Sequence, residues 1–254
     1  MVFKVKILHF QDFINYILGP GISTIPVAVG NHQHSTDHVE MLLLSALYLL
    51  CVLGYVSCDA TSMIPLSKDS YAYSIGDVKS SVIVDFYIDL TCSSCLENWP
   101  IITEVVQTYR EKVYFNFRVF PLPYHQQAFI VAKGASLVNH FSKGKSVFTY
   151  MNTAFANQAL IYNTATADMT YNQVVEIVEG WATTDTGVSS EEFRIGMNSS
   201  NTIGSNIEMY TRYMWKYTCL ENVFATPFYA INGLQVGNLN TFADWQETLD
   251  SLLK

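Results

Sequence analysis

Cys92 and Cys95 are the residues of this chain best suited to chemistry, because only two serines separate them and a strand-like run precedes them. That run, Ser81–Leu90, is rich in β-branched and aromatic residues, and Leu96–Arg110 behind the pair is predicted to be a helix. The cysteines therefore stand where a strand turns into a helix N-terminus. Unpaired N–H groups and the positive end of the helix dipole stabilise a thiolate there. This placement indicates thiol–disulfide chemistry.

The elements that must position the pair include strands that lie far from it in the sequence. Ser81–Leu90 is apolar on both faces, which predicts a central strand covered on both sides. Lys112–Leu122 alternates well enough to predict a second strand. Asn232-Gly233 is a strong hairpin signal. Its two strands are predicted at Phe228–Ile231 and Leu234–Val236, and a final helix is predicted to have one apolar side, made by Phe242, Trp245, Leu249, Leu252 and Leu253.

Helical patterns dominate between Pro123 and Cys219, and we expect a helical insertion at about residues 124–218. Two capping boxes support this prediction, in which an N-cap hydroxyl is followed three residues later by an amide or a carboxylate. They pair Thr170 with Gln173 and Ser189 with Glu192. The predicted helices are Gln126–Phe141, Ser146–Leu160, Thr170–Trp181 and Ile207–Leu220.

Several short motifs accompany this order of elements. They are Asp89 three residues before Cys92, Pro100 five after Cys95 where a proline should kink the helix, Phe120-Pro121-Leu122-Pro123-Tyr124-His125 with Ala128, Ala225-Thr226-Pro227-Phe228, and Ile231-Asn232-Gly233.

Together, the order of elements and these motifs resemble the thioredoxin fold with the helical insertion of the DsbA-like family, over roughly Ser67–Lys254. The resemblance implies an α/β fold, with a central mixed sheet flanked by helices and an inserted helical subdomain. It also implies exchange of disulfides with protein substrates.

The site residues follow from the residue positions together with this resemblance. Cys92 is expected to be the nucleophile, exposed at the strand end, and Cys95 the more buried thiol that resolves a mixed disulfide. Pro227 resembles the family's cis-proline that faces the disulfide. The backbone of Thr226 would pair with an extended substrate strand. The alternatives are a structural disulfide or idle thiols, and an ordinary trans proline.

Three carboxylates, Asp85, Asp89 and Glu97, are candidates for moving the proton of Cys95. Asp85 falls in mid-strand, where a carboxylate without compensation is costly and would suit a general base. The alternative for Asp89 and Glu97 is a solvated rim or first-turn residue that favours the helix dipole. Between these two interpretations the sequence favours the second.

The dipeptide Ser93-Ser94 departs from the family, which often has Pro-His there. Without that histidine we expect a less acidic Cys92 and a less oxidising couple than in strong oxidants. His125 matches a family motif but is expected to begin a helix. Cys219 is expected to be buried and inert, with pairing to another chain or a third redox thiol as alternatives.

An apolar run in Met41–Ala60 is about right for a signal-peptide core, with cleavage before Asp59 or after Ala60. Met1–Glu40 is then a gene-model extension or a leader, and Thr61–Lys254 is the DsbA-like domain. The alternative is a short signal anchor. These features predict a secreted protein or one in the lumen of the secretory pathway, outside the cytoplasm.

Composition limits the partners. The chain of 254 residues has a formal charge of -8 and a pI near 5.1, without a Lys/Arg stripe, so nucleic acid and anionic membrane surfaces are poor candidates. Membrane contact is expected only through an uncleaved leader. A metal at Cys92 and Cys95 would need two further ligands, and none is indicated. No dissociable cofactor is required, because the cysteine pair is itself the redox centre.

The sequence thus predicts a thiol–disulfide oxidoreductase that acts on protein thiols or disulfides and exchanges electrons with an unidentified redox partner. Whether it oxidises, reduces or isomerises depends on its potential and compartment. One alternative is a redox-silent binding module or chaperone. Another is a glutathione-using transferase or isomerase of the kappa type, which needs a serine or cysteine at the helix start but no second cysteine.

Overall fold

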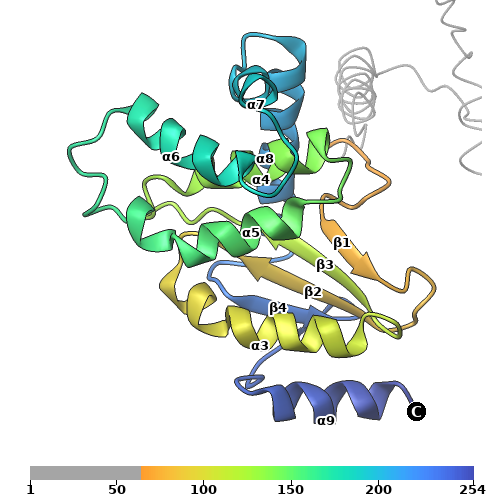
Figure 1. Cartoon of the computed structure of the whole chain (residues 1–254). Helices are drawn as coiled ribbons and strands as arrows, with labels where there is room; N and C mark the ends of the chain where they lie inside the picture. The colour runs from red at the N-terminus through yellow and green to blue at the C-terminus, as the bar shows by residue number, and fades with distance from the viewer. Residues whose placement is uncertain (1–63) are drawn as a thin grey trace, which may run out of the picture. The chain divides into compact units, whose positions relative to one another are not determined.

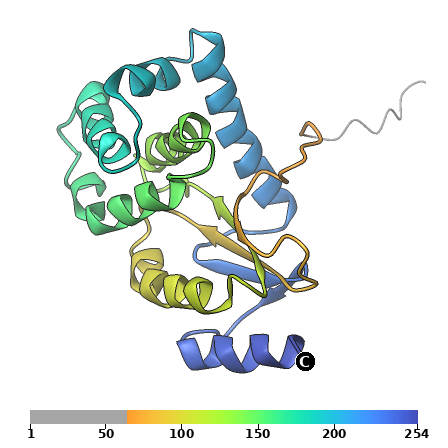
Figure 2. The ribbon, with the colours of Figure 1, turned by 45° about the vertical axis from the view of Figure 1, so that its right-hand side comes forward.

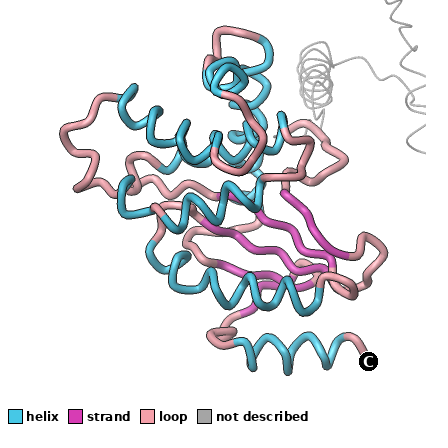
Figure 3. The backbone as a smooth tube through the Cα atoms, viewed as in Figure 1, coloured by secondary structure: helices cyan, strands magenta, loops and turns pink. Residues whose placement is uncertain are grey.

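Residues 64–254 are described by the computed structural model, so the interpretations of Met1–Glu40 and Met41–Ala60 lie outside the described part. Five strands form one mixed sheet in the order β1-β3-β2-β4-β5 (Figure 1, Figure 3). β2 and β3 run parallel, whereas the other three neighbouring pairs are antiparallel. The strands are β1 (Tyr73–Gly76), β2 (Ile83–Ile88), β3 (Tyr114–Val119), β4 (Phe228–Ile231) and β5 (Leu234–Val236).

The strand that leads to the cysteines is central and buried, as its composition predicted. β2 lies between β3 and β4, and five of its six residues are buried. Successive residues of a strand point to opposite faces. Phe86 packs on one face against Trp245 of α9 (Phe242–Leu252), with ring centroids 5.4 Å apart. Tyr87 belongs to a separate apolar cluster with Phe120 and Leu122.

Two helices that are far apart in sequence, α3 (Ser93–Tyr109) and α9, lie on the same side of the sheet (Figure 1). Tyr109 of α3 donates a hydrogen bond to Asp250 of α9 at 2.8 Å. Pro100 lies inside α3. Because it has no N–H, it leaves one carbonyl of the preceding turn without its helical partner. The C-x-x-C motif lies at the N-terminal end of α3, shortly after the end of β2.

The predicted helical insertion is present between β3 and β4. α8 runs from the far end of this insertion back to the sheet, as the turned view shows (Figure 2). Both predicted capping boxes form, at Thr170 and at Ser189. The elements of the insertion are α4 (Ala128–Phe141), α5 (Val147–Ala156), a 3-10 helix (Gln158–Ile161), α6 (Tyr171–Thr183), α7 (Ser190–Met197) and α8 (Thr202–Leu220).

Some helix boundaries differ from the sequence prediction: α4 begins at Ala128 instead of Gln126, α8 begins at Thr202 instead of Ile207, and α7 was indicated only by its capping box.

Four other details differ as well. β1 was not predicted, since four residues ending in a glycine show no alternation long enough to read. α3 begins at Ser93, three residues before the apolar periodicity starts. The predicted helix Ser146–Leu160 breaks at Asn157, where a 3-10 helix takes over. Leu252 is 46% exposed, although it was placed on the buried side of the last helix.

Two glycines test how tightly the insertion is packed. A methyl group on Gly134 of α4 would collide with the Tyr150 hydroxyl, which is held by a 2.8 Å hydrogen bond to Val131. A methyl group on Gly180 of α6 would meet open space. Both substitutions gain the same helix propensity, so Gly134→Ala should be less stable than Gly180→Ala by about 1–3 kcal/mol.

Urea unfolding of the two variants and the wild type measures this difference. Gly180→Ala should be more stable than the wild type by about 0.5–1 kcal/mol. Equal midpoints for the two variants would contradict close packing of α4 against α5.

Candidate active site

The two cysteines sit at the first turn of α3. Cys92 is the N-cap residue, and its carbonyl accepts the first helical hydrogen bond from Leu96 at 3.1 Å. Cys95 is inside the helix and has no exposed surface. Cys92 itself is only 7% exposed, so the expectation of an exposed nucleophile is wrong. The reason is tertiary: the Cys92 thiol lies 3.4 Å from the carbonyl oxygen of Thr226, and the loop that carries Thr226 covers it.

As free thiols, Cys92 and Cys95 have very different acidities. A hydrogen bond from Cys95 is the main cause that lowers the pKa of Cys92 to about 5, against the opposing effect of burial. Burial raises the pKa of Cys95 well above its usual value, and the neighbouring Cys92 raises it further. At neutral pH the pair is therefore one thiolate and one thiol. A pKa of about 5 for Cys92 lies between about 3.5 for DsbA and about 7 for thioredoxin.

The Thr226–Pro227 peptide bond is cis, as the resemblance implied. The Thr226 hydroxyl is buried and has no hydrogen-bond partner within residues 64–254. This side chain helps to lower the pKa of Cys92 and acts in the same direction on the pKa of Cys95. The Thr226 hydroxyl is therefore available to donate a hydrogen bond to the Cys92 thiolate.

Asp89 is buried rather than solvated, so the rim interpretation is wrong for this residue. One carboxylate oxygen accepts from the N–H (2.8 Å) and hydroxyl (2.7 Å) of Thr91. The other accepts from the N–H of Leu122 at 3.0 Å and lies 2.7 Å from Nδ1 of His125. Only the backbone N–H of Asp89 reaches Cys95, at 3.4 Å from its sulfur. The carboxylate thus organises the loop in front of the cysteines and forms no hydrogen bond with either sulfur.

His125 is a site residue that was not recognised from the sequence. It lies in the turn before α4 instead of beginning a helix. Its hydrogen bond with Asp89 is the main cause that raises its pKa, burial opposes this, and the charge of Cys92 adds to it. The imidazolium form therefore persists to higher pH than in a free histidine. The family motif that contains His125 was the signal that could have identified it.

Asp85 and Glu97 are not brought to the cysteines. Asp85 accepts a hydrogen bond from Asn116 at 3.0 Å and forms a buried ion pair with Arg118. It points to the sheet face opposite to that of Phe86, because adjacent strand residues alternate. Glu97 is exposed and forms no ion pair within the described part of the chain, which fits the solvated alternative. Neither carboxylate forms a hydrogen bond with Cys95.

Gln158, the first residue of the 3-10 helix, is a second contact that the sequence did not reveal. Its buried amide donates to the carbonyl oxygens of Leu90 and Cys92, both at 3.0 Å. Its own oxygen accepts from the Tyr162 hydroxyl at 2.6 Å. The break in the helix at Asn157 brings the Gln158 side chain to this position, and no local sequence pattern predicts that break. Gln158 thereby connects the insertion to the backbone of the active-site loop.

Two further observations concern the described residues as a whole. No group of three His, Cys, Asp or Glu side chains in residues 64–254 is arranged to hold a metal ion. None of the helices in this range has the length and apolar character needed to span a bilayer.

Cys219 is exposed, so the expectation that it is buried is wrong. The buried positions of α8 are Gly204, Ile207, Thr211, Met214 and Thr218, and Cys219 falls just outside this stripe.

The thioredoxin family model matches residues 68–251, and the chain belongs to this family. Oxidised BdbD from Bacillus subtilis is 18% identical with a TM-score of 0.57, covering 72% of this chain and 93% of that one. The thiol-disulfide exchange protein alpha-DsbA2 from Wolbachia pipientis is 17% identical with a TM-score of 0.54, covering 70% and 86%. Reduced DsbG from Mycobacterium tuberculosis is 17% identical with a TM-score of 0.54, covering 71% and 86%.

No curated protein sequence matches the chain. The structural similarities establish the fold, which is thioredoxin-like with the helical insertion of the DsbA type.

Proposed function

We propose that this protein is a thiol–disulfide oxidoreductase that acts on protein substrates through Cys92 and Cys95. The observation that carries the proposal is the asymmetry of the pair: the pKa of Cys92 is lowered to about 5, and that of buried Cys95 is raised. An attacking thiolate beside a protonated resolving thiol is the arrangement that disulfide exchange requires. The similar proteins named for thiol-disulfide exchange and disulfide bond oxidoreduction add support.

Reduction of a substrate disulfide proceeds in two steps. The Cys92 thiolate attacks one substrate sulfur, which forms a mixed disulfide and releases the other sulfur as a thiolate that takes a proton from water. Cys95 then loses its proton to solvent and attacks the Cys92 sulfur. The Cys92–Cys95 disulfide forms, the second substrate thiol leaves, and two electrons have passed to the substrate. Oxidation of a substrate dithiol is the reverse, and an unidentified redox partner restores the starting state.

The surroundings of the pair supply the remaining functions. We assign binding of the substrate backbone to Thr226 and Pro227, because Pro227 offers no N–H and leaves the loop open to an extended chain. Asp89 acts by holding Thr91 and His125 in place rather than by accepting the proton of Cys95. The reaction is proposed to take place outside the cytoplasm, where protein disulfides persist.

Reduction of insulin by dithiothreitol tests the proposal. The wild type should accelerate it, and Cys92→Ser and Cys95→Ser should each lose this turnover. Cys219→Ser is the matched control and should keep it, because Cys219 lies outside the site. An inactive wild type would favour the redox-silent binding module. Glutathione-dependent activity that survives in Cys95→Ser would favour the kappa-type transferase.

A further inference from the structure

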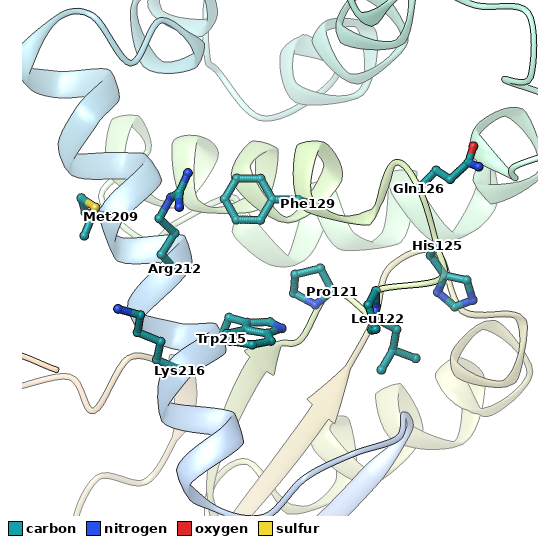
Figure 4. A pocket seen from close by; sticks show the side chains of 10 residues that line it. Pro121, Leu122, His125, Gln126, Phe129, Met209, Arg212, Trp215 and Lys216 are labelled. Atoms are coloured by element: carbon teal, nitrogen blue, oxygen red, sulfur yellow. The ribbon is translucent and has the colours of Figure 1, made fainter. Parts of the chain in front are cut away.

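A cavity of about 500 Å³ lies between α8 and the segment that leads from β3 into α4 (Figure 4). The apolar residues that line it include Pro121, Phe129, Met209 and Trp215. Trp215 is 38% exposed although its ring stacks on Phe120 at 5.9 Å. A cavity of this size takes one or two side chains of a bound segment.

The charged side chains that line this cavity are cationic. Within residues 64–254 its titratable lining residues are His125, Arg212 and Lys216, and no carboxylate in this range lines it. His125 is compensated by Asp89 at 2.7 Å, so the uncompensated charge comes from α8. Figure 4 shows Arg212 of α8 and Phe129 of α4 pointing towards each other, and the guanidinium carbon lies 5.6 Å from the ring centroid. Lys216 forms no ion pair within residues 64–254. The cavity therefore presents a cationic surface on a protein whose formal charge is -8.

Within the described part of the chain, the carboxylate that pairs with Arg212 does not neutralise this surface. Glu208 contacts Arg212 at 2.6 Å, but it also pairs with the buried ammonium of Lys133 at 3.0 Å. One carboxylate thus serves two cations, which leaves one positive charge in addition to Lys216. An anionic ligand with an apolar body complements both the charge and the apolar wall.

The position of His125 connects this cavity to the cysteines. His125 lines the 500 Å³ cavity and also a second one of about 350 Å³, which is bounded by Thr91 and Ser93. Those two residues flank Cys92 in the sequence. A polypeptide whose cysteine reacts with Cys92 can therefore extend past His125 towards α8.

We infer that the cavity lined by Phe129, Arg212, Trp215 and Lys216 binds an acidic segment of the polypeptide substrate, a few residues from its reacting cysteine. The carboxylate contacts Lys216 and Arg212, and a neighbouring aliphatic or aromatic side chain lies on Trp215. This inference rests on the proposed function and adds the class of substrate that the protein prefers.

The test uses two peptides whose single cysteine is held in a mixed disulfide. They differ only in carrying Glu or Gln at positions a few residues from that cysteine. The wild type should show a KM about five- to tenfold lower for the acidic peptide at low salt, and less at high salt. Lys216→Glu should remove this preference. The matched control Lys145→Glu makes the same charge change on an exposed lysine beyond the other end of α4, and it should keep the preference.

Calorimetric titration with the same peptides, their cysteine replaced by serine, separates this inference from the proposed function. Preferential binding of the acidic serine peptide, lost in Lys216→Glu, supports the pocket even if insulin turnover fails. Active exchange with equal KM values for the two peptides overturns the pocket alone. Binding of phosphatidylserine vesicles, lost in Lys216→Glu, without any peptide preference would also overturn it, since the occupant would then be a membrane.

Discussion

Titration of the reduced protein should show Cys92 losing its proton near pH 5, since its pKa is lowered to about 5. An unperturbed cysteine has a pKa of about 8.5, so the ratio of thiolate to thiol at neutral pH should rise on the order of 10³-fold. The hydrogen bond from Cys95 is the main cause, with Thr226 and the backbone of Ser94 and Cys95 acting in the same direction. The ultraviolet absorbance of the thiolate, followed against pH, measures the midpoint.

Variants identify the donor. Cys92→Ser should lose the transition, and Cys95→Ala should raise its midpoint because the principal donor is gone. Cys95→Ser keeps a hydroxyl donor, so its midpoint should lie below that of Cys95→Ala. A wild-type midpoint near that of an ordinary cysteine would refute the assignment of Cys92 as the ionised thiol.

The lowered pKa of Cys92 also makes the free energy of unfolding of the reduced protein depend on pH. The pKa of Cys92 is lower in the folded state than in the unfolded state. The stabilisation is therefore complete above the unfolded value of about 8.5 and is lost as the pH falls through the folded value. Only the reduced form gains this stabilisation, which makes the Cys92–Cys95 couple more oxidising than one with an ordinary thiol. With Ser93-Ser94 between the cysteines, the acidity of Cys92 is thus marked but not extreme.

Replacement of Asp85 by alanine should destabilise the protein by about 3–5 kcal/mol, because it leaves a buried guanidinium without its counter-charge. The Asp85 and Arg118 side chains are 11% and 3% exposed. Arg118 is further enclosed by the ring of Tyr217, whose centroid is 4.5 Å from the guanidinium carbon. The midpoint of urea unfolding should fall with an unchanged slope.

The exposed pair of Arg110 and Glu111 provides the control. These side chains are 57% and 82% exposed, so Glu111→Ala should change the stability by no more than about 0.5 kcal/mol. If Asp85→Ala behaved like Glu111→Ala, the ion pair with Arg118 would not be buried in solution. The outcome also bears on mechanism, since a structural Asp85 explains why it is charged in mid-strand without a role at Cys95.

Features with local causes were predictable from the sequence. The C-x-x-C pair follows a strand and begins a helix, and the residues on either side of the pair predict both elements. The Asn232-Gly233 turn needs positive φ at both positions, which these two residue types adopt most readily, and both have it here. The capping boxes at Thr170 and Ser189 form within four residues of chain. Motif order then made the fold class recognisable over most of the chain.

The resemblance to the DsbA-like family placed the Thr226–Pro227 loop opposite the cysteines. The individual contacts around the two thiols could not be predicted, because they join residues far apart in sequence. Cys92 is covered by Thr226, 134 residues away, and its carbonyl is held by Gln158, 66 residues away. His125 meets Asp89 across 36 residues. None of these pairs leaves a periodic trace in the sequence. The contacts of Gln158 and His125 depend on how the insertion folds back over the sheet, whereas Thr226 reaches Cys92 from the loop before β4.

The sequence by itself therefore determined the chemistry available to this protein: two thiols at a strand-to-helix junction, followed much later by a Thr-Pro loop. The tertiary structure alone decided how those thiols behave. It buried both sulfurs, directed the Cys95 thiol and the Thr226 hydroxyl towards Cys92, and paired Asp85 with Arg118 instead of with the site. The physical reason is that acidity depends on burial and on hydrogen-bond partners, and both are set by distant segments that only the folded chain brings together.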